Sequence, residues 1–364
     1  MAKILISGQW LWKQYQEACA NALERLGHDV VRFGWYRHFY TKNPDGSSAY
    51  KSRFAKIQNR FIFGPLISRI NDDLFKTAAE TRPDIVWLYN DTHILPGTIS
   101  RLKNLLPQSC FVQYTNDNPW GKSQEYFQWR YFRKSIPLFD LNLCYRKSNV
   151  EDFRSGGARE VKLLRSYFIE EEAFPIERRK VEDRFRSDVV FTGHFEDDGR
   201  IEKLSDIMKA GWDLKLFGTG WDNAIARLPK DDPLNALVPV KAARGDDYRH
   251  SICGAKIAIA FLSKINEDTY TRRNFEIPAM GTFMLSEYTE DLSTLFVEGK
   301  EAEFFRDKDE LARKLKYYLT NDAEREKVAA AGRDRVNRDG HEVKARMKQF
   351  MSDVASVGAG RCAG

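Results

Sequence analysis

Cysteine is scarce in this chain, and its distribution argues against stabilisation by bound zinc or by disulfide bonds. The five cysteines are scattered over 364 residues without a C-x-x-C pair, so neither a zinc motif nor a disulfide framework is indicated. They are Cys19, Cys110, Cys144, Cys253 and Cys362. Long apolar runs are also missing, because none approaches the roughly 18 residues of a membrane span. The first residues, MAKILISGQW, enter a strand pattern at once, so we expect a cytoplasmic protein without a signal peptide.

Charge is present in both signs but is unevenly distributed. Residues 1–165 contain 25 Lys and Arg against 15 Asp and Glu, a net charge of +10. The remainder contains 33 against 37, a net charge of −4. A basic half favours an anionic partner such as a nucleic acid, an anionic lipid or a phosphorylated molecule, although a solvated surface is the simpler alternative.

Strand and helix patterns alternate along the whole chain. The apolar run at 3–7 is followed by helical spacing up to Gly27, and then by a second strand pattern, which together predict a β-α-β unit. After the polar segment 169–187, strand and helix patterns alternate again. Because 364 residues exceed what one core usually holds, we expect two α/β domains, each Rossmann-like and doubly wound, facing each other across a cleft.

Three segments follow from this interpretation. We expect residues 1–168 to form an N-terminal domain and residues 187–345 to form a C-terminal domain. Residues 346–364 form a C-terminal helix and tail, and 169–187 is the expected linker.

The stretch TRRNFEIPAMGTFMLSE, residues 271–287, is the most informative in the chain. Its pattern predicts a short helix after a strand, with Arg272, Arg273 and Glu276 at the start of that helix. Free N–H groups and an arginine fork suit a diphosphate, and a carboxylate suits ribose hydroxyls because it accepts two hydrogen bonds. The alternative is that the glutamate only favours the helix start and that the arginines are surface residues.

These residues carry a resemblance to a known family. The segments TRRNFEIPAMGTFMLSE, LFVEGKEAEFF, ELARKLKYYL and AGRDRV, in this order, resemble the CgeB-like (spore-maturation-type) glycosyltransferases of the GT-B fold superfamily. The specific part of the resemblance covers about residues 187–345. It implies that two Rossmann-like domains hold a nucleotide diphosphate-sugar donor, with residues 1–168 on the acceptor side and residues 187–345 binding the nucleotide sugar. It further implies that Glu276 binds the ribose. It also implies basic residues near the diphosphate, for which Arg200 and Lys203 are the candidates.

Many retaining enzymes of this fold carry a second acid eight residues before the ribose glutamate. Asp268 occupies that position here, with Glu267 beside it, so the usual pair of glutamates is only approximated. We expect Asp268 to be a catalytic candidate, and a solvated loop is the alternative.

Further candidates stand where predicted strands end. Gly8 and Gly193 would let the backbone approach the donor, and Gly218 would line the base site. Asp117 and Asp91 are candidates for a general base on the acceptor hydroxyl, since each follows an apolar strand. The competing role for both aspartates is to cap the following turn.

Aromatic and basic residues are interleaved at 32–70 and 122–135. Such segments suit a membrane surface that presents a lipid-linked acceptor. They also suit single-stranded nucleic acid, which we consider the weaker alternative. Inward packing of the aromatic residues is the third interpretation.

The sequence therefore predicts a metal-independent glycosyltransferase of the hexosyltransferase type. It would move a sugar from a nucleotide diphosphate-sugar to a hydroxyl acceptor in cell-surface glycan or glycolipid synthesis, with no cofactor besides the donor substrate. The protein would be cytoplasmic and peripheral at the inner face of the membrane, with the arginines stabilising the leaving diphosphate. A sugar-nucleotide epimerase on the same fold and a non-catalytic nucleotide-sugar-binding protein remain alternatives.

Overall fold

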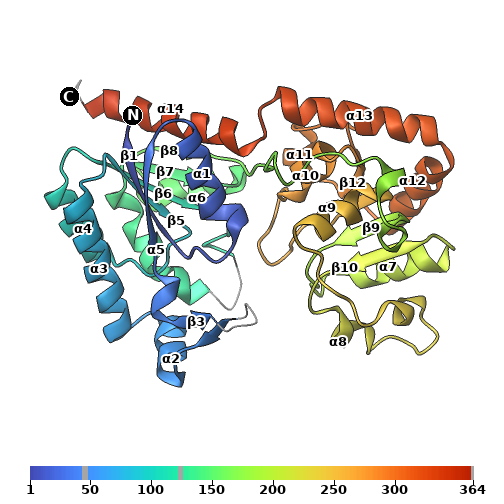
Figure 1. Ribbon diagram of the computed structural model, residues 1–364, viewed down its shortest axis with the longest axis horizontal. Coiled ribbons are helices and arrows are strands. Elements are labelled where there is room, and N and C mark those ends of the chain that lie inside the picture. Colours follow the sequence, from blue (N-terminus) through green and yellow to red (C-terminus); the bar gives the residue numbers. More distant parts are fainter. Residues whose placement is uncertain (43–47, 122–125, 362–364) are drawn as a thin grey trace. The chain divides into compact units, whose positions relative to one another are not determined.

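The computed structural model describes residues 1–42, 48–121 and 126–361, and the chain divides into two compact units (Figure 1). Unit 1 comprises Met1–Arg165 together with Val343–Gly364, and unit 2 comprises Ser166–Glu342. Each unit is built on its own parallel sheet.

Unit 1 has a six-stranded sheet with the order β2-β1-β5-β6-β7-β8, and its strand pairs are parallel. The strands are β1 (Lys3–Gly8), β2 (Asp29–Gly34), β5 (Ile85–Tyr89), β6 (Cys110–Thr115), β7 (Leu141–Cys144) and β8 (Val161–Leu163). β5 and β6 are buried along their whole length, as expected for strands covered on both faces. A short antiparallel hairpin, β3 (Tyr40–Lys42) and β4 (Ser48–Tyr50), lies outside this sheet.

The helices of unit 1 follow the alternation seen in the sequence. They are α1 (Ala18–Arg25), α2 (Arg53–Phe61), α3 (Pro65–Thr81), α4 (Pro96–Leu105), α5 (Arg130–Ser135), α6 (Val150–Ser155) and α14 (Val343–Arg361). The last of these is distant in sequence, yet Phe350 stacks on Trp87 with ring centroids 4.3 Å apart. Lys162 pairs with Asp353 at 3.4 Å, so α14 completes unit 1.

Unit 2 has a five-stranded parallel sheet with the order β10-β9-β11-β12-β13. The strands are β9 (Ser187–Thr192), β10 (Leu214–Phe217), β11 (Ala255–Ala260), β12 (Phe283–Glu287) and β13 (Glu303–Phe305). The helices are α7 (Arg200–Lys209), α8 (Trp221–Ile225), α9 (Asp246–Cys253), α10 (Arg273–Ala279), α11 (Glu290–Ser293), α12 (Lys308–Thr320) and α13 (Asp322–Arg338). α7 and α12 lie beside each other. α9 contacts β9 and β11, α10 contacts β11 and β12, and α13 contacts β12.

The segment expected to be a linker packs into unit 2. Between Ile169 and Arg186 the chain forms two 3-10 turns, Arg178–Lys180 and Asp183–Phe185. Val181 and Phe185 are buried, and the Arg178 Nε donates to the Gly254 carbonyl at 2.9 Å. Polar composition suggested a spacer, but apolar residues spaced among the charges anchor this segment to the domain.

The expected α/β class with two doubly wound parallel sheets is confirmed. In unit 1, β1 lies between β2 and β5, and in unit 2, β9 lies between β10 and β11. In each sheet the first strand along the chain is thus flanked by the second strand on one side and by the third on the other. The direction of strand addition therefore reverses between β1 and β5 in unit 1, and between β9 and β11 in unit 2. Ligands of doubly wound sheets bind beyond the carboxyl ends of the strands at this reversal. We therefore expect ligand-binding residues among those that follow β1, β5, β9 and β11.

Within the described part of the chain, no helix combines the length and the apolarity that crossing a bilayer requires.

Candidate functional site

Two glycines shape the carboxyl edge of the unit 2 sheet. Gly193 follows β9 and Gly218 follows β10, and the Gly193 N–H donates to the Phe217 carbonyl at 2.8 Å. A Cβ atom on Gly218 would lie 1.8 Å from the Gly193 carbonyl oxygen, and Gly218 has a φ of +153°. The Trp221 Nε1 donates to the same oxygen at 2.8 Å. Gly218 is therefore needed for this close backbone approach, whereas a Cβ atom on Gly193 would lie 2.6 Å from the Phe191 ring. The roles of both glycines at the donor stay predictions.

A buried carboxylate lies at the start of α10. Glu276 receives an ion pair from the Arg272 guanidinium at 2.6 Å, and its other oxygen accepts a 2.8 Å hydrogen bond from the Tyr248 hydroxyl. Tyr248 is in the first turn of α9, so two helices meet at this carboxylate. Burial of the hydroxyl and the neighbouring Glu276 charge raise the pKa of Tyr248 well above its usual value, which keeps it a donor. Each carboxylate oxygen has further lone-pair capacity for a ligand hydroxyl.

Arg273 is the first residue of α10 and precedes Glu276 by three residues in the sequence. Its side chain is half-buried, and its Nε is buried without a hydrogen-bond partner among the described residues. The Arg273 charge counteracts the rise in the pKa of Tyr248, which shows that the guanidinium lies near the Tyr248–Glu276 pair. An arginine that forms no ion pair among the described residues is well suited to bind an anionic ligand.

Arg200 and Lys203 begin α7, but their contacts differ. The buried Arg200 guanidinium pairs with Asp198 at 2.6 Å and with Glu196 at 3.6 Å, and it donates to the His194 carbonyl at 2.7 Å. Arg200 thus holds the loop after β9 in place. Lys203 donates a long 3.4 Å hydrogen bond to the Gly199 carbonyl and lies 3.8 Å from Glu287 at the end of β12. Its ammonium group also lies 5.7 Å from the Phe261 ring centroid. The diphosphate role of both residues stays a prediction, and Lys203 is the less constrained of the two.

Asp268 lies in the loop between β11 and α10. Its backbone N–H donates to the Ser263 carbonyl at 2.9 Å, and the preceding Glu267 adopts a φ of +51°. Thr269 fastens the loop through a 2.9 Å hydrogen bond to Asp291. Asp268 therefore occupies an ordered loop after the reversal strand β11, and its catalytic role stays a prediction.

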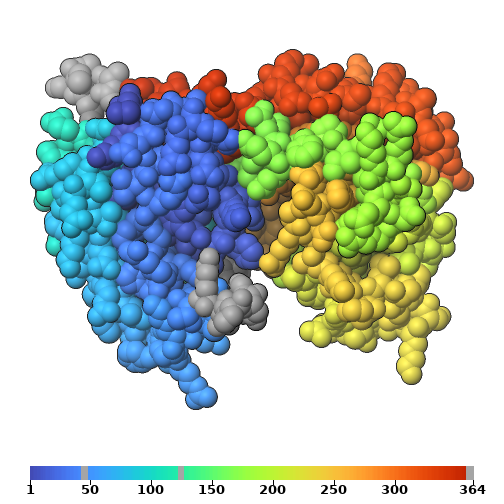
Figure 2. All heavy atoms as spheres, viewed as in Figure 1, coloured from blue at the N-terminus to red at the C-terminus, as the bar shows by residue number. Residues whose placement is uncertain are grey.

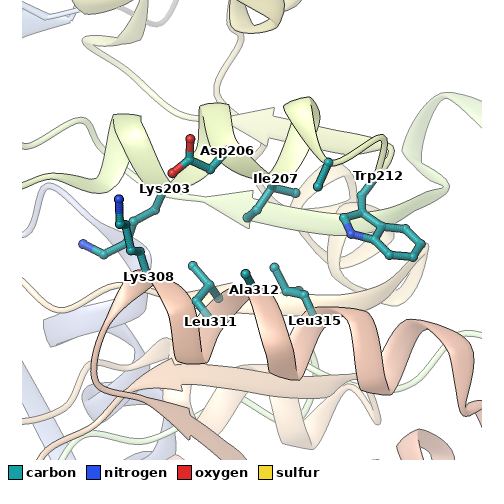
Figure 3. A pocket seen from close by; sticks show the side chains of 9 residues that line it. Lys203, Asp206, Ile207, Trp212, Lys308, Leu311, Ala312 and Leu315 are labelled. Atoms are coloured by element: carbon teal, nitrogen blue, oxygen red, sulfur yellow. The ribbon is translucent and has the colours of Figure 1, made fainter.

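A small hollow lies between α7 and α12 (Figure 3). Its volume is about 50 Å³, and Ile207, Trp212, Leu311 and Leu315 provide most of its apolar lining. Lys203 and Lys308 lie at the end opposite Trp212 (Figure 3). Sites for drug-sized ligands occupy roughly 300–1,000 Å³, so this hollow does not accommodate a nucleotide sugar.

In unit 1, Gly8 ends β1 at the reversal point. A Cβ atom there would lie 2.7 Å from the Gln16 Nε2 and 2.8 Å from the Tyr89 carbonyl oxygen. The Gln16 amide donates to that carbonyl at 3.3 Å. Gly8 is thus required for close packing inside unit 1, and its role in making room for the donor stays a prediction.

Asp91 follows β5 and is buried. It accepts hydrogen bonds from the Ser7 hydroxyl and from the His93 backbone N–H, the latter at 3.1 Å. Burial raises the pKa of Asp91 to about 6 and lowers the pKa of His93 to about 3. The His93 ring stacks on Trp35 with centroids 3.8 Å apart. These contacts favour the alternative in which Asp91 stabilises the turn after β5.

Asp117 follows β6 and is more accessible than Asp91. Its carboxylate accepts a 3.0 Å hydrogen bond from the Asn90 amide, and its backbone N–H donates to the Thr115 hydroxyl at 3.1 Å. The Thr115 hydroxyl in turn donates to Asn90 at 2.7 Å. Asn90 adopts a φ of +52°, a conformation that asparagine tolerates better than most residues. This arrangement fixes one oxygen of Asp117 and leaves a half-buried carboxylate that can accept a proton.

Two residues of these networks were missed by sequence reasoning. Tyr248 is one of 15 tyrosines and lies in a polar helix start, and Asn90 directly follows a predicted strand beside the candidate Asp91. Their partners, Glu276 and Asp117, are 28 and 27 residues away, so no local signal identifies the pairs.

No group of three or more His, Cys, Asp and Glu side chains within the described residues is arranged to hold a metal ion. Asp307 and Asp309 form a D-x-D sequence after β13, but Asp307 caps α12 by accepting a 2.7 Å bond from the Glu310 N–H. Metal independence stays a prediction.

Part of the chain is similar to a known family. Residues 200–352 match a family model described as glycosyl transferase-like. This range contains Lys203, Gly218, Asp268 and the whole segment from Arg272 to Glu276. The two parallel sheets have the arrangement of GT-B glycosyltransferases, and residues 200–352 are similar to a glycosyltransferase family, in agreement with the prediction from the sequence.

Solved structures of low sequence identity have the same fold. A sucrose-phosphate synthase from Thermosynechococcus elongatus superposes with a TM-score of 0.72 at 12% identity, over 99% of this chain and 100% of that chain. Alr3699/HepE from Anabaena, in complex with UDP-glucose, has a TM-score of 0.68 at 14% identity, over 98% and 100% of the two chains. A UDP-forming trehalose-phosphate synthase from Burkholderia xenovorans has a TM-score of 0.65 at 12% identity, over 98% and 99%. No curated protein matches the sequence significantly.

Proposed function

We propose that this protein transfers a hexosyl group from a nucleoside diphosphate sugar to a hydroxyl group of a cell-surface glycan or glycolipid. One observation carries the proposal: the buried Glu276 carboxylate, held by Tyr248, stands next to Arg273, whose Nε has no partner among the described residues. Both lie at the carboxyl edge of a parallel sheet, inside the region that matches the glycosyl transferase-like model. The narrower CgeB-like relationship belongs to this proposal, since it rests on the same segment.

The donor roles follow from the chemistry of these side chains. Glu276 accepts hydrogen bonds from ribose hydroxyls, because its oxygens retain acceptor capacity beside Arg272 and Tyr248. Arg273 binds the diphosphate through its planar fork. The complex of Alr3699/HepE with UDP-glucose makes this nucleotide sugar the first donor to test.

In the proposed reaction, the acceptor oxygen forms a bond to the anomeric carbon while the bond from that carbon to the diphosphate breaks. The bonding electrons leave with the nucleoside diphosphate, and Arg273 stabilises the added negative charge. The acceptor proton passes to Asp117, whose second oxygen is held by Asn90. Asp268 is a further candidate for contact with the sugar. No step requires a metal or another cofactor.

The proposal also includes the acceptor and the location of the reaction. A lipid-linked or glycan acceptor would be used at the cytoplasmic face of the membrane, where the basic unit 1 meets an anionic surface. The +10 net charge of residues 1–165 supports this arrangement.

A ligand panel tests the proposed function. We expect thermal stabilisation by a nucleoside diphosphate and its sugars, but not by the free sugar, and slow hydrolysis of the donor when no acceptor is present. Stabilisation without hydrolysis or transfer would indicate a non-catalytic binding protein. Conversion of the donor to its epimer would indicate an epimerase, and a lack of response to every nucleotide would refute the proposal.

A further inference from the structure

Helix α2 of unit 1 presents three parallel stripes of different chemistry. Each stripe has the spacing i, i+3, i+7, which aligns residues along one side of a helix. The inward stripe contains the buried residues Ala55, Gln58 and Ile62. The second stripe is apolar and contains Phe54, Ile57 and Phe61, and the third is basic and contains Arg53, Lys56 and Arg60. The second and third stripes are both exposed.

The helix is held firmly on its inward side. The Ser52 hydroxyl caps it by accepting a 3.0 Å bond from the Ala55 N–H, and Gln58 accepts from the Leu66 N–H at 2.8 Å. The Asn59 amide bonds to the Tyr50 hydroxyl at 3.0 Å, and its oxygen lies 2.8 Å from the His93 Nε2. The exposure of the apolar stripe is therefore a property of an ordered helix.

Two more phenylalanines extend the apolar stripe beyond the end of α2. Phe63 lies 6.4 Å from Phe61 between ring centroids. The Arg130 guanidinium donates to the Phe61 and Ile62 carbonyls at 2.6 and 2.9 Å and lies 3.9 Å from the Phe127 ring centroid. The exposed fractions are 62% for Phe54, 45% for Ile57, 44% for Phe61, 53% for Phe63 and 53% for Phe127. These five residues and the basic stripe are called the α2 patch below.

Within residues 48–71, which include α2 and its flanking residues, all charged side chains are basic. Residues 48–71 contain five Lys and Arg and no Asp or Glu. In Figures 1 and 2 this segment forms the lower end of unit 1, in blue. Contiguous exposed apolar groups on a folded protein mark an interaction surface. Here the partner must accept apolar side chains and provide negative charge beside them.

We propose that the α2 patch docks on a bilayer surface that contains anionic lipids. A helix lying in the membrane interface needs an apolar side that enters the boundary between headgroups and acyl chains, with Lys and Arg beside it at the level of the headgroups. The adjacent apolar and basic stripes of α2 have this geometry. Single-stranded nucleic acid would instead be bound by aromatic rings and cations distributed along a groove. The docking surface goes beyond the donor chemistry proposed above and does not depend on it.

Vesicle binding measured without donor or acceptor tests this inference. The full chain is sedimented with vesicles of phosphatidylglycerol and phosphatidylcholine in equal parts, and with vesicles of phosphatidylcholine alone. We expect binding to the anionic vesicles that weakens as salt is raised. The triple variant R53Q/K56Q/R60Q should bind about 100-fold more weakly, since each cation near an anionic surface contributes roughly a factor of five. The variant F54Q/I57Q/F61Q should lose at least about tenfold.

Matched variants separate this surface from a general charge effect. K76Q/K344Q/K348Q removes three exposed positive charges elsewhere in unit 1, and V297Q/Y317Q removes exposed apolar groups from unit 2. Both should bind vesicles nearly as well as the wild type, and all variants should keep wild-type thermal stability and donor binding. Equal losses in the control and patch variants would overturn the inference, as would the absence of wild-type binding to anionic vesicles.

Other occupants give different results. Patch-dependent binding of an oligouridylate without vesicle binding would identify a nucleic-acid surface and overturn the membrane inference. A wild-type dimer that the F54Q/I57Q/F61Q variant converts to a monomer, again without vesicle binding, would identify a contact between two copies of the chain. Because donor binding is measured separately, either result leaves the proposed transferase activity standing.

Discussion

The Tyr248 hydroxyl donates a 2.8 Å hydrogen bond to Glu276, joining the first turn of α9 to the first turn of α10. Arg272 occupies the other oxygen of this carboxylate at 2.6 Å. The carboxylate is therefore fixed from both sides before any ligand binds, which lowers the entropic cost of binding a ribose.

The first prediction concerns Glu276. Glu276→Gln preserves the shape of the side chain but removes the charge from hydrogen bonds worth about 1.5–3 kcal/mol. We expect the affinity for UDP and for UDP-sugars to fall roughly 10- to 150-fold, whichever sugar is attached. Tyr248→Phe should cause a smaller loss, because the carboxylate keeps its charge and Arg272. Isothermal calorimetry measures both, and unchanged affinity in Glu276→Gln would reduce this glutamate to a residue that only starts a helix.

The second prediction separates two arginines. Arg273→Lys keeps the charge but loses the planar fork, so we expect weaker binding of diphosphates with little loss of nucleoside binding or thermal stability. Arg200→Lys should mainly lower the melting temperature, because Arg200 is buried against Asp198 and Glu196. Calorimetry with nucleoside, monophosphate and diphosphate, together with thermal denaturation, measures the contrast. If instead Arg200→Lys weakened diphosphate binding and Arg273→Lys only lowered the melting temperature, the diphosphate would be assigned to Arg200.

The third prediction concerns Asp117. Asp117→Asn should keep donor binding but lower the transfer rate by about 10²-fold or more, the usual effect of removing a general base. Asp72→Asn, at an exposed position of α3, is the control and should leave transfer unchanged. Single-turnover transfer assays measure the effect. Wild-type turnover in Asp117→Asn would leave this residue with the turn-capping role only.

The fourth prediction concerns Asp91 and pH. Burial raises the pKa of Asp91 from 3.8 to about 6, so between these values the folded chain holds a proton that the unfolded chain has released. Rising pH therefore lowers the free energy of unfolding in this window. His93 acts in the opposite direction, because its pKa falls from 6.5 to about 3 and only the unfolded chain is protonated between these values. In the wild type the two effects largely cancel.

Asp91→Asn removes one of these two effects. Relative to the wild type, the free energy of unfolding of the variant should rise by about 2 kcal/mol between about pH 4 and pH 6. Urea denaturation across this range measures the difference, with Asp72→Asn again as the control. A difference that is independent of pH would show that Asp91 keeps an ordinary pKa in the folded protein.

Much of the fold could be predicted from local patterns. The runs that became β1, β5, β6, β9, β11 and β12 are short, apolar and bounded by polar residues, so their burial follows from composition alone. The segment 169–187 was interpreted as a linker because its charges outnumber its apolar residues. Val181 and Phe185 nevertheless bury themselves in unit 2, since a few well-placed apolar side chains are enough to anchor a polar segment.

The aromatic and basic segments 32–70 and 122–135 also show that a local pattern does not determine which side chains are buried. Spacing alone left open whether they pack inward or face outward, and the structure shows both outcomes. Phe33, Phe39 and Phe132 are buried, whereas Phe54 and Phe63 are exposed. Residues 43–47 and 122–125 of these segments lie outside the described residues.

The sequence by itself determined the alternation of strands and helices, the polar residues at the strand ends, and the Arg272–Arg273–Glu276 cluster, because each depends on neighbours along the chain. Only the tertiary structure decided which charges are already paired. Arg200 and Arg273 both begin helices, yet Asp198 and Glu196 neutralise the first, whereas no hydrogen bond to the Arg273 Nε forms among the described residues. That difference depends on how the loop after β9 folds back on Arg200, since proximity in sequence alone does not show which charges pair. It distinguishes an arginine that supports a loop from one that can bind a ligand.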